Sequence, residues 1–367
     1  MQLVADGKPG GGTTVVLELV RALRGEPGLE LALVSAPGSY ALDEARKLGI
    51  RAAALDLWRS RLDPAAPAAL RRVLTGLGTD LVHAHGARAG LVLARMRRPP
   101  PYVYTVHGYH FPRKPWTARL AGAAAEALIH ARATASIWVS EHDRRTARAW
   151  RLDRAGPLDR VIVNGIDFAA FPDRSPPDPD LIGFLGRLHP QKNPLLLAEI
   201  LALLPPPLRL RVIGGGELEQ DLRARARALG CADRLEITGA LPRDAALRAL
   251  GGCSVVLLPS AWEAVPVALV EAMHQGIVPI AAAVGGIPEL IEPERSGVLI
   301  EGHAPRAFAE AVLALRADPS RMQRLAAAAV HRARAVYALE RMVRGHRELY
   351  AGVAGSAMPA PGRGAAR

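Results

Sequence analysis

Short apolar runs rich in Val, Leu and Ile alternate along the chain with longer stretches of Ala, Leu and Arg at helical spacing. This alternation predicts β-strands that are each followed by a helix, which is typical of parallel sheets covered by helices. In the first half we expect strands near 2–5, 29–34, 50–55, 80–84, 102–106, 135–139 and 160–163. The clearest helices of this half are expected near 13–25, 64–76, 116–132 and 141–150.

The segment 171–180, FPDRSPPDPD, is too rich in proline and charge for the interior of a helix or strand. Beyond it we expect strands near 181–185, 208–213, 234–238, 254–258, 278–282 and 297–300, and helices over 305–351. The pattern predicts two doubly wound α/β domains. Their expected extents are an N-terminal domain over 1–170, a linker over 171–180, a C-terminal domain over 181–351 whose last helix can pack back on the first, and a disordered tail over 352–367.

Composition agrees with α/β cores, because half of the 367 residues are hydrophobic and only 4% are aromatic. Cys231 and Cys253 lie far apart and show neither disulfide nor metal-ligand spacing. No window has the ~18 to 20 apolar residues of a membrane span, and no signal region follows Met1. We therefore expect a cytoplasmic protein. The first strand begins almost at Met1, which suggests that the given start is late.

The net charge of +12 is concentrated in the first half, where residues 1–170 hold 24 Lys and Arg against 15 Asp and Glu. The basic clusters are Arg95, Arg97 and Arg98; Arg113 and Lys114; and Arg144, Arg145, Arg148, Arg151 and Arg154. They could meet an anionic membrane surface or an acidic acceptor, or they could form a solvated face in an Arg-rich protein. Nucleic acid is disfavoured, because aromatic side chains do not interleave with these clusters.

The densest chemical signal is PSAWEAVPVALVEAMHQG at 259–276, which follows the apolar strand SVVLL. Pro266 suits the first position of a helix, and the free amides around residues 265–267, of which Pro266 has none, would then point to the carboxyl edge of the sheet. Glu263 precedes these amides and Glu271 lies more than a turn inside the helix. The two carboxylates can address different parts of one ligand, such as the ribose and the transferred sugar of a sugar nucleotide. The alternatives are a capping acid and a solvent-facing helical residue.

The second signal is GRLHPQKNP at 186–194, directly after the strand LIGFL. Arg187 and Lys192 place two cations on one strand-end loop, enough to neutralise a diphosphate without a metal. Only four of the 47 basic residues are Lys, which makes Lys192 more informative than an arginine, although a plain basic loop is the alternative. The sequence Asp178–Pro179–Asp180 falls in the expected linker and away from a strand end. We expect no cofactor and no metal.

In the first half, Gly10, Gly11 and Gly12 open the first long helix, where the backbone can approach an anion or a sugar. His107 lies at a strand end in YTVHGYH and is a candidate for contact with the sugar. For His83 and His85, in LVHAHG, packing and substrate contact are equally consistent with the sequence.

Together these motifs resemble glycosyltransferase family 4, whose members have the GT-B fold of two Rossmann-like domains facing a central cleft. The resemblance also includes VNGID at 163–167 and VGGIPELI at 284–291. It implies that Arg187 and Lys192 bind the donor diphosphate, Glu271 the ribose, and Glu263 with Ala264, Val265 and Pro266 the transferred sugar. It further implies that Gly10 and Gly11 approach the phosphate and His107 the sugar. Thr13 and Ala264 depart from the acidic residue and the Gly common in the family at these positions.

The expected function is transfer of a sugar from a UDP- or GDP-linked donor to a saccharide or lipid-linked saccharide, with retention of anomeric configuration. Such a reaction belongs to cell-surface polysaccharide or glycolipid synthesis, and the enzyme could be peripheral on the inner face of the plasma membrane. The expected catalytic residues are Glu263, Arg187, Lys192 and His107. The alternatives are a sugar-nucleotide epimerase on the same fold and a non-catalytic protein that binds a nucleotide sugar.

Overall fold

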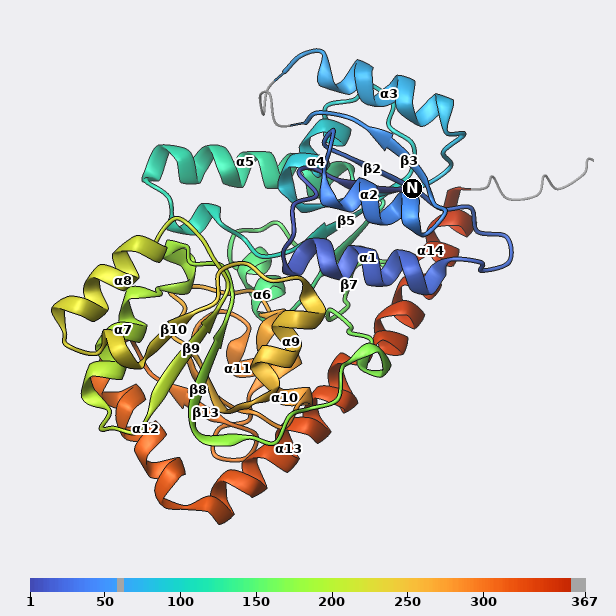
Figure 1. Cartoon of the computed structure of the whole chain (residues 1–367). Coiled ribbons are helices and arrows are strands. Elements are labelled where there is room, and N and C mark those ends of the chain that lie inside the picture. The colour runs from blue at the N-terminus through green and yellow to red at the C-terminus, as the bar shows by residue number, and fades with distance from the viewer. Residues whose placement is uncertain (58–62, 358–367) are drawn as a thin grey trace, which may run out of the picture. The chain divides into compact units, whose positions relative to one another are not determined.

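The computed structural model describes residues 1–57 and 63–357 (Figure 1). These residues form two compact units, each described by itself below. The first unit combines Met1–Gly165 with the chain from Leu339 onward, and the second is Ile166–Ala338.

The first unit has a seven-stranded parallel sheet in the order β3-β2-β1-β4-β5-β6-β7. The strands are β1 (Gln2–Val4), β2 (Ala32–Ser35), β3 (Arg51–Ala54), β4 (Val82–His85), β5 (Tyr102–Val106), β6 (Ala135–Trp138) and β7 (Arg160–Val161). The helices are α1 (Gly11–Leu23), α2 (Tyr40–Lys47), α3 (Ala66–Gly76), α4 (Gly86–Ala94), η1 (Phe111–Arg113), α5 (Trp116–Arg132), α6 (Glu141–Ala149) and α14 (Leu339–Ala357). The central strands are buried throughout, as expected for a sheet covered on both faces.

The second unit has a six-stranded parallel sheet in the order β10-β9-β8-β11-β12-β13. Its strands are β8 (Asp178–Leu185), β9 (Arg209–Ile213), β10 (Leu235–Ile237), β11 (Cys253–Leu258), β12 (Val278–Ala282) and β13 (Val298–Ile300). Its helices are η2 (Phe168–Ala170), η3 (Pro190–Lys192), α7 (Leu195–Leu203), α8 (Glu219–Ala228), η4 (Ala232–Arg234), α9 (Arg243–Gly251), α10 (Val267–His274), α11 (Ile287–Leu290), α12 (Pro305–Ala317) and α13 (Pro319–Tyr337).

The predicted α/β class with two parallel sheets is confirmed, and each expected strand has a counterpart in the structure. The expected linker differs from the structure, because its last residues, Asp178 to Asp180, form the start of β8. The chain passes between the two units at Gly165 and Ile166, so the segment 171–180 lies wholly inside the second unit.

The C-terminal helix belongs to the first unit and not to the second. α14 packs against α1, and its side chains Leu349 and Val353 are fully buried. The expectation of a disordered tail from residue 352 is wrong over 352–357, because the helix continues to Ala357. The Ala and Gly content of that segment hid a helix that is stabilised by tertiary packing. The rest of the expected tail, 358–367, lies outside the described residues.

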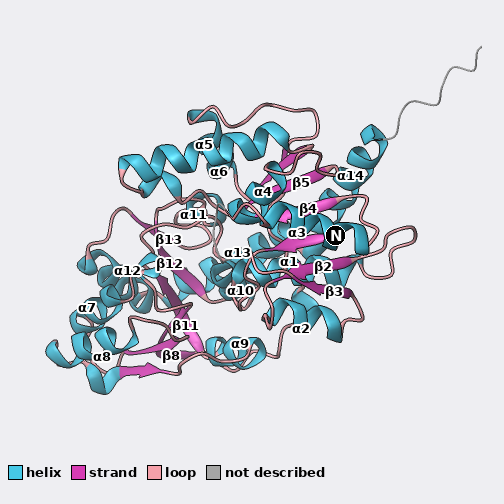
Figure 2. Cartoon of the chain, turned by 90° about the horizontal axis from the view of Figure 1, so that it is seen from above, coloured by secondary structure: helices cyan, strands magenta, loops and turns pink. Residues whose placement is uncertain are grey.

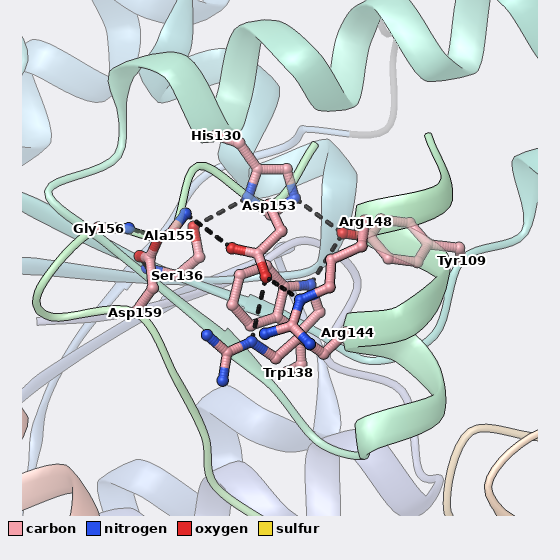
Figure 3. A network of polar contacts seen from close by, with 10 residues as sticks. All are labelled: Tyr109, His130, Ser136, Trp138, Arg144, Arg148, Asp153, Ala155, Gly156 and Asp159. Atoms are coloured by element: carbon pink, nitrogen blue, oxygen red, sulfur yellow. Dashed lines mark hydrogen bonds and ion pairs between the residues drawn. The ribbon is translucent and has the colours of Figure 1, made fainter. Parts of the chain in front are cut away.

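A network of buried polar groups ties α5 to β6 of the first sheet (Figure 3). Tyr109 joins His130 of α5 to Trp138 of β6, with oxygen–nitrogen distances of 2.8 and 3.0 Å. The other ring nitrogen of His130 lies 2.8 Å from the hydroxyl of Ser136. Because every partner is buried, this network fixes which side of α5 faces inward.

Candidate functional site

The strand order places a topological switch point between β8 and β11 in the second unit. From β8 the chain continues to β9 on one side, and from β11 it continues to β12 on the other. Open α/β sheets bind ligands at the carboxyl ends of strands at such a point. Arg187 follows β8 and Glu263 follows β11, so the two strongest sequence signals meet there.

Lys192 and Glu263 form a direct ion pair at this edge. The Nζ of Lys192 lies 2.7 Å from Oε1 of Glu263, and the two side chains are only 16% and 6% exposed. The 3-10 turn η3 ends at Lys192 and directs its side chain toward the loop after β11. Arg187, by contrast, is exposed. The site therefore offers one cation neutralised by the protein and one that solvent can reach.

Several polar groups hold the carboxylate of Glu263 in place. The Ser260 hydroxyl donates to Oε1 at 2.7 Å, and the Gln191 amide lies 3.5 Å from Oε2. The same amide donates to the Trp262 carbonyl at 3.1 Å, and His303 donates to the Ser260 carbonyl at 3.0 Å. Glu263 is thus fixed on both of its oxygens before any ligand arrives, which is the preorganisation that favours electrostatic catalysis.

The helix after this loop, α10, begins one residue later than expected, with Pro266 as its N-cap. Its first backbone amides therefore point to the same edge as Glu263, where the helix dipole favours negative charge. Glu271 lies in the second turn, and its Oε1 accepts from the Nε of Arg243 at 3.2 Å. The Arg243 guanidinium in turn lies over the Phe171 ring, 5.6 Å from its centroid.

Two glycines hold the acidic loop close to the start of α11. A Cβ on Gly285, whose φ is +61°, would lie 1.8 Å from the Glu263 carbonyl oxygen. A Cβ on Gly286 would lie 2.2 Å from the Ala264 carbonyl oxygen, to which the Gly286 amide donates at 2.9 Å. No other residue type fits such a close approach of two backbones.

Glycines also hold the loop after β9 close to the loop after β8, which carries Arg187. A Cβ on Gly214 would lie 2.1 Å from the carbonyl oxygen of Gly186, and one on Gly216 would lie 2.4 Å from that of Leu188. The Leu188 amide also donates to the Gly215 carbonyl at 2.9 Å. The glycines after β9, which lack a dinucleotide-binding fingerprint, therefore serve to pack the loop that carries Arg187.

In the first unit, the glycine loop leads directly into α1. Gly10 is the N-cap and Gly11 the first helical residue, and the loop is exposed. A Cβ on Gly10 or Gly12 would meet nothing within 4 Å, so packing inside the unit does not require these glycines. This differs from Gly7, whose Cβ would lie 2.3 Å from the Ser35 hydroxyl.

His107, which is half-buried, belongs to a cluster with the buried His83 and His85 at the switch point of the first sheet, between β1 and β4. Alternation along β4 and β5 places His83, His85 and Thr105 on one face of the sheet, with His107 just beyond Thr105. The Nε2 of His83 lies 2.6 Å from Thr105 Oγ1, and the Nδ1 of His85 lies 3.1 Å from the Nε2 of His107. His346 of α14 completes the cluster, with its ring 5.5 Å from that of His83.

Gln2 orders the hydrogen bonds of this cluster. Its Oε1 accepts from the Nε2 of His85 at 2.8 Å, and its amide nitrogen donates to the Tyr350 hydroxyl at 3.1 Å. The Nδ1 of His85 is then an acceptor, so His107 donates through Nε2 and keeps Nδ1 as a free acceptor. The Tyr350 hydroxyl donates to the Nδ1 of His83 at 2.6 Å.

Burial keeps these histidines neutral. It lowers the pKa of His107 to about 4, with a smaller contribution from the neighbouring His346 ring. The pKa values of His83 and His85 are lowered well below the usual range by the same cause. His85, Thr105, His107 and His346 line a small, mainly apolar cavity in this unit. His107 is therefore a neutral hydrogen-bonding group at neutral pH.

The structure thus brings some predicted residues together and separates others. Lys192 and Glu263 are in contact, whereas Glu271 is paired with Arg243. Gly10, Gly11 and His107 lie in the other unit. Sequence reasoning missed Ser260, Gln191, His303 and Arg243, because single polar residues in loops and helix starts carry no periodic signal. Only the motif VGGIPELI pointed to Gly285 and Gly286.

The expected linker aspartates lie at the opposite edge from these residues. Asp178 and Asp180 are at the amino end of β8, where they pair with Arg209 at 2.6 Å and Arg316 at 2.5 Å. They begin a strand and do not sit in a linker, because Asp178 already pairs with β11 and the chain runs on into the buried residues 181–184 of β8. Within residues 1–57 and 63–357, no group of three or more His, Cys, Asp or Glu side chains is placed to hold a metal ion.

Two doubly wound units, with a cation and a carboxylate fixed at a switch point, define a protein of the nucleotide-binding α/β class. Residues 166–332 match the model of glycosyl transferases group 1, and residues 10–163 match that of the glycosyl transferase 4-like domain. The D-inositol 3-phosphate glycosyltransferase of Thermomonospora curvata is 31% identical over 294 residues, which are 70% of this chain and 67% of that protein. The chain belongs to glycosyltransferase family 4, as its motifs suggested.

Another relative is the UDP-Gal:alpha-D-GlcNAc-diphosphoundecaprenol alpha-1,3-galactosyltransferase of Escherichia coli, 29% identical over 65% of this chain and 67% of that protein. A D-inositol 3-phosphate glycosyltransferase of Xylanimonas cellulosilytica matches over 38% of its own length. The structure of Anabaena HepE in complex with UDP and glucose has a TM-score of 0.80 and 22% identity, over 95% of this chain and 98% of that chain. The expected GT-B fold is confirmed.

Proposed function

We propose that the chain is a retaining glycosyltransferase that uses a UDP- or GDP-linked sugar and transfers the sugar to a saccharide or lipid-linked saccharide. The observation that carries the proposal is the ion pair between Lys192 and Glu263 at the switch point of the second sheet. A donor diphosphate that binds beside Arg187 would attract Lys192, while Glu263 stays fixed by Ser260. One arrangement thereby provides a cation for the leaving group and a carboxylate for the sugar.

The chemistry follows from these charges. As the bond between the anomeric carbon and the diphosphate breaks, negative charge develops on the leaving group and positive charge on the sugar. Lys192 and Arg187 stabilise the negative charge on the leaving group, and Glu263 stabilises the positive charge on the sugar. The leaving phosphate oxygen takes the proton of the acceptor hydroxyl on the same face, which retains the anomeric configuration. Two cations supply the charge that a metal would otherwise bring, so we propose a metal-independent reaction.

The remaining site residues take the roles that the family implies. Glu271 binds the ribose hydroxyls, and Ala264 and Val265 lead into the α10 amides near the transferred sugar. Gly10 and Gly11 approach the donor phosphate, and His107 contacts the sugar through its unprotonated nitrogen. A neutral His107 supports this role, because an imidazolium would repel the developing positive charge.

The acceptor is proposed from relatives and charge. One relative is named for a diphosphoundecaprenol acceptor and another for D-inositol 3-phosphate, and both acceptors are anionic. The net positive charge of residues 1–170 suits either kind. A lipid-linked acceptor would require the chain to work at the inner face of the plasma membrane as a peripheral, cytoplasmic protein in cell-surface polysaccharide or glycolipid synthesis. Among the described residues, no helix is long and apolar enough to cross a bilayer.

Thermal-shift screening against UDP-, GDP- and ADP-sugars tests the donor assignment. A donor at 100 times its dissociation constant should stabilise the fold by about 2.7 kcal/mol. The stabilising donor is then incubated with saccharide, inositol phosphate and undecaprenyl-linked acceptors, and the product linkage is read by NMR. Formation of an epimerised sugar from donor alone would favour the epimerase alternative. Binding without any turnover would favour a non-catalytic protein.

A further inference from the structure

Helix α5 (Trp116–Arg132) presents an apolar face to solvent, the reverse of an ordinary surface helix. Its outward large side chains are Trp116, Leu120 and Leu128, which are 68%, 57% and 39% exposed. Apart from Arg132 at its end, the other exposed positions of the helix are the small residues Thr117, Ala118, Ala121, Ala124, Ala127 and Ala131. At 100° per residue, Trp116, Leu120 and Leu128 lie within about a third of the helix circumference.

Two of the polar residues of α5 point inward, whereas Thr117, Arg119 and Arg132 are exposed or half-buried. Glu126 and His130 are both buried, and the Tyr104 hydroxyl donates to Glu126 Oε2 at 2.8 Å. His130 is held by the network through Tyr109 and Ser136 (Figure 3). These bonds fix the rotation of the helix, so the apolar face cannot turn toward the core. In two views α5 lies at the outer edge of the first unit, beside α4 (Figures 1 and 2).

Basic side chains lie at both ends of this face. Arg113 and Lys114 precede its first turn. At the other end, Arg132 donates to the Met96 carbonyl at 2.9 Å, next to the exposed Arg97 and Arg98. Arg154 donates to the Ala131 carbonyl at 2.8 Å. The only acid of α5, Glu126, is buried, so the exposed face carries no carboxylate.

We propose that α5 and these flanking cations dock on an anionic lipid bilayer. Trp and Leu insert into the boundary between headgroups and acyl chains, and Arg and Lys bind the lipid phosphates. A second copy of the chain fits the face poorly, because both ends are cationic and any pairing of two such helices brings like charges together. The inference rests on the proposed lipid-linked acceptor for its purpose, but the surface itself is independent of turnover.

Not every basic cluster of the first half takes part in this surface. Arg144 and Arg148 both donate to Asp153, at 3.1 and 3.0 Å, so this carboxylate offsets part of their charge, although the Arg148 side chain stays 56% exposed (Figure 3). The docking surface is therefore defined by α5 and its ends, and not by total charge.

Sedimentation of the full-length chain with sucrose-loaded vesicles tests the proposal. We expect binding to vesicles of phosphatidylcholine with phosphatidylglycerol, and at least tenfold weaker binding to phosphatidylcholine alone. Combining Leu120→Glu with Leu128→Glu should weaken binding at least tenfold, because each change removes an apolar side chain from the lipid. The matched control is Leu203→Glu, at a leucine that is 47% exposed in the second unit, and it should bind as the wild type does.

Separate variants test the contribution of the cations and the depth at which Trp116 inserts into the bilayer. Arg97→Gln and Arg98→Gln should each weaken binding about fivefold, whereas Arg248→Gln, at an exposed position in the second unit, should not. Brominated phosphatidylcholine should quench the fluorescence of the wild type, and Trp116→Phe should lose most of that quenching. Melting temperatures of all variants should match the wild type, because the altered side chains are exposed.

The proposal would be overturned if the combined Leu120→Glu and Leu128→Glu variant bound vesicles as well as the Leu203→Glu variant does. It would also be overturned if the wild type showed no preference for phosphatidylglycerol. A wild-type dimer that Leu120→Glu dissociates would also overturn it, in favour of a contact between copies. Transfer to soluble acceptors is measured in parallel. If the wild type transfers sugar to soluble acceptors but does not bind vesicles, only the docking surface is refuted. If it binds vesicles but transfers no sugar, only the proposed enzymatic function is refuted.

Discussion

Replacing Lys192 with Met separates the structural from the chemical role of the ion pair. Methionine keeps the length of the side chain and removes its charge. In the structure, the Nζ of Lys192 lies 2.7 Å from Glu263, and both groups are largely buried. Loss of one partner of a buried pair costs about 3 to 5 kcal/mol, because the other charge stays buried without compensation. Glu263 keeps the Ser260 hydroxyl, so we expect about 3 kcal/mol.

The effect on catalysis comes from the lost attraction between Lys192 and the donor diphosphate, and not from the pairing with Glu263. A cation about 4 Å from an anion contributes about 4 kcal/mol at an effective dielectric constant of about 20. If Lys192 stabilises the leaving diphosphate, Lys192→Met should lower the turnover number about 1,000-fold. Affinity for the donor should fall less, because the leaving group carries more negative charge in the transition state than in the bound donor.

Combining Lys192→Met with Glu263→Gln should restore much of the stability, since no unpaired charge remains buried, while turnover stays low. Stability is measured by urea unfolding, affinity by calorimetry with the donor found in the thermal-shift screen, and turnover by release of the nucleotide diphosphate. A folded Lys192→Met protein with less than a tenfold loss of turnover would refute the role of Lys192 in stabilising the leaving group.

Three further predictions concern packing, protonation and hydrogen bonding. Gly285→Ala should lower stability by at least 2 kcal/mol in urea unfolding, whereas Gly302→Ala, with φ +77° and open space around it, should cost only about 1 kcal/mol. Burial raises the pKa of Glu126 to about 7 from 4.5, so Glu126→Gln should gain stability over the wild type as pH rises from 5 to 8, by up to about 3 kcal/mol. Gln2→Met should leave His107 as a mixture of two tautomers, visible in ¹⁵N NMR at neutral pH.

Each of these has an outcome that contradicts it. Equal losses for the two glycine variants would mean that the close approach of backbones adds nothing. The pKa of Glu126 is higher in the folded state than in the unfolded state. Below about pH 7 the folded state therefore holds a proton that the unfolded state has lost, and the stability of the wild type falls as pH rises. A flat stability difference across that range would show that the carboxyl is not buried in solution. An unchanged His107 spectrum in Gln2→Met would remove Gln2 from the chain of hydrogen bonds.

Strand and helix positions could be predicted from local pattern, because burial on both faces of a parallel sheet selects unbroken Val, Leu and Ile runs. The two α/β units and the strand-end positions of Arg187, Lys192 and Glu263 followed from that pattern alone. The boundaries between units did not, because the proline-rich segment 171–180 marks rigidity and not a change of unit. The helical residues 352–357 were missed, because they end a helix, α14, that packs on α1 more than 300 residues earlier.

The sequence by itself determined the fold class, the family and the residues that carry charge at the strand ends. Only the tertiary structure decided how those charges are used: Lys192 is neutralised by Glu263, Glu271 by Arg243, and the aspartates of the expected linker by Arg209 and Arg316. The reason is physical. Periodicity records whether a residue is inside or outside, whereas ion pairs and tautomers depend on which loops meet across a sheet edge, and strand order sets that.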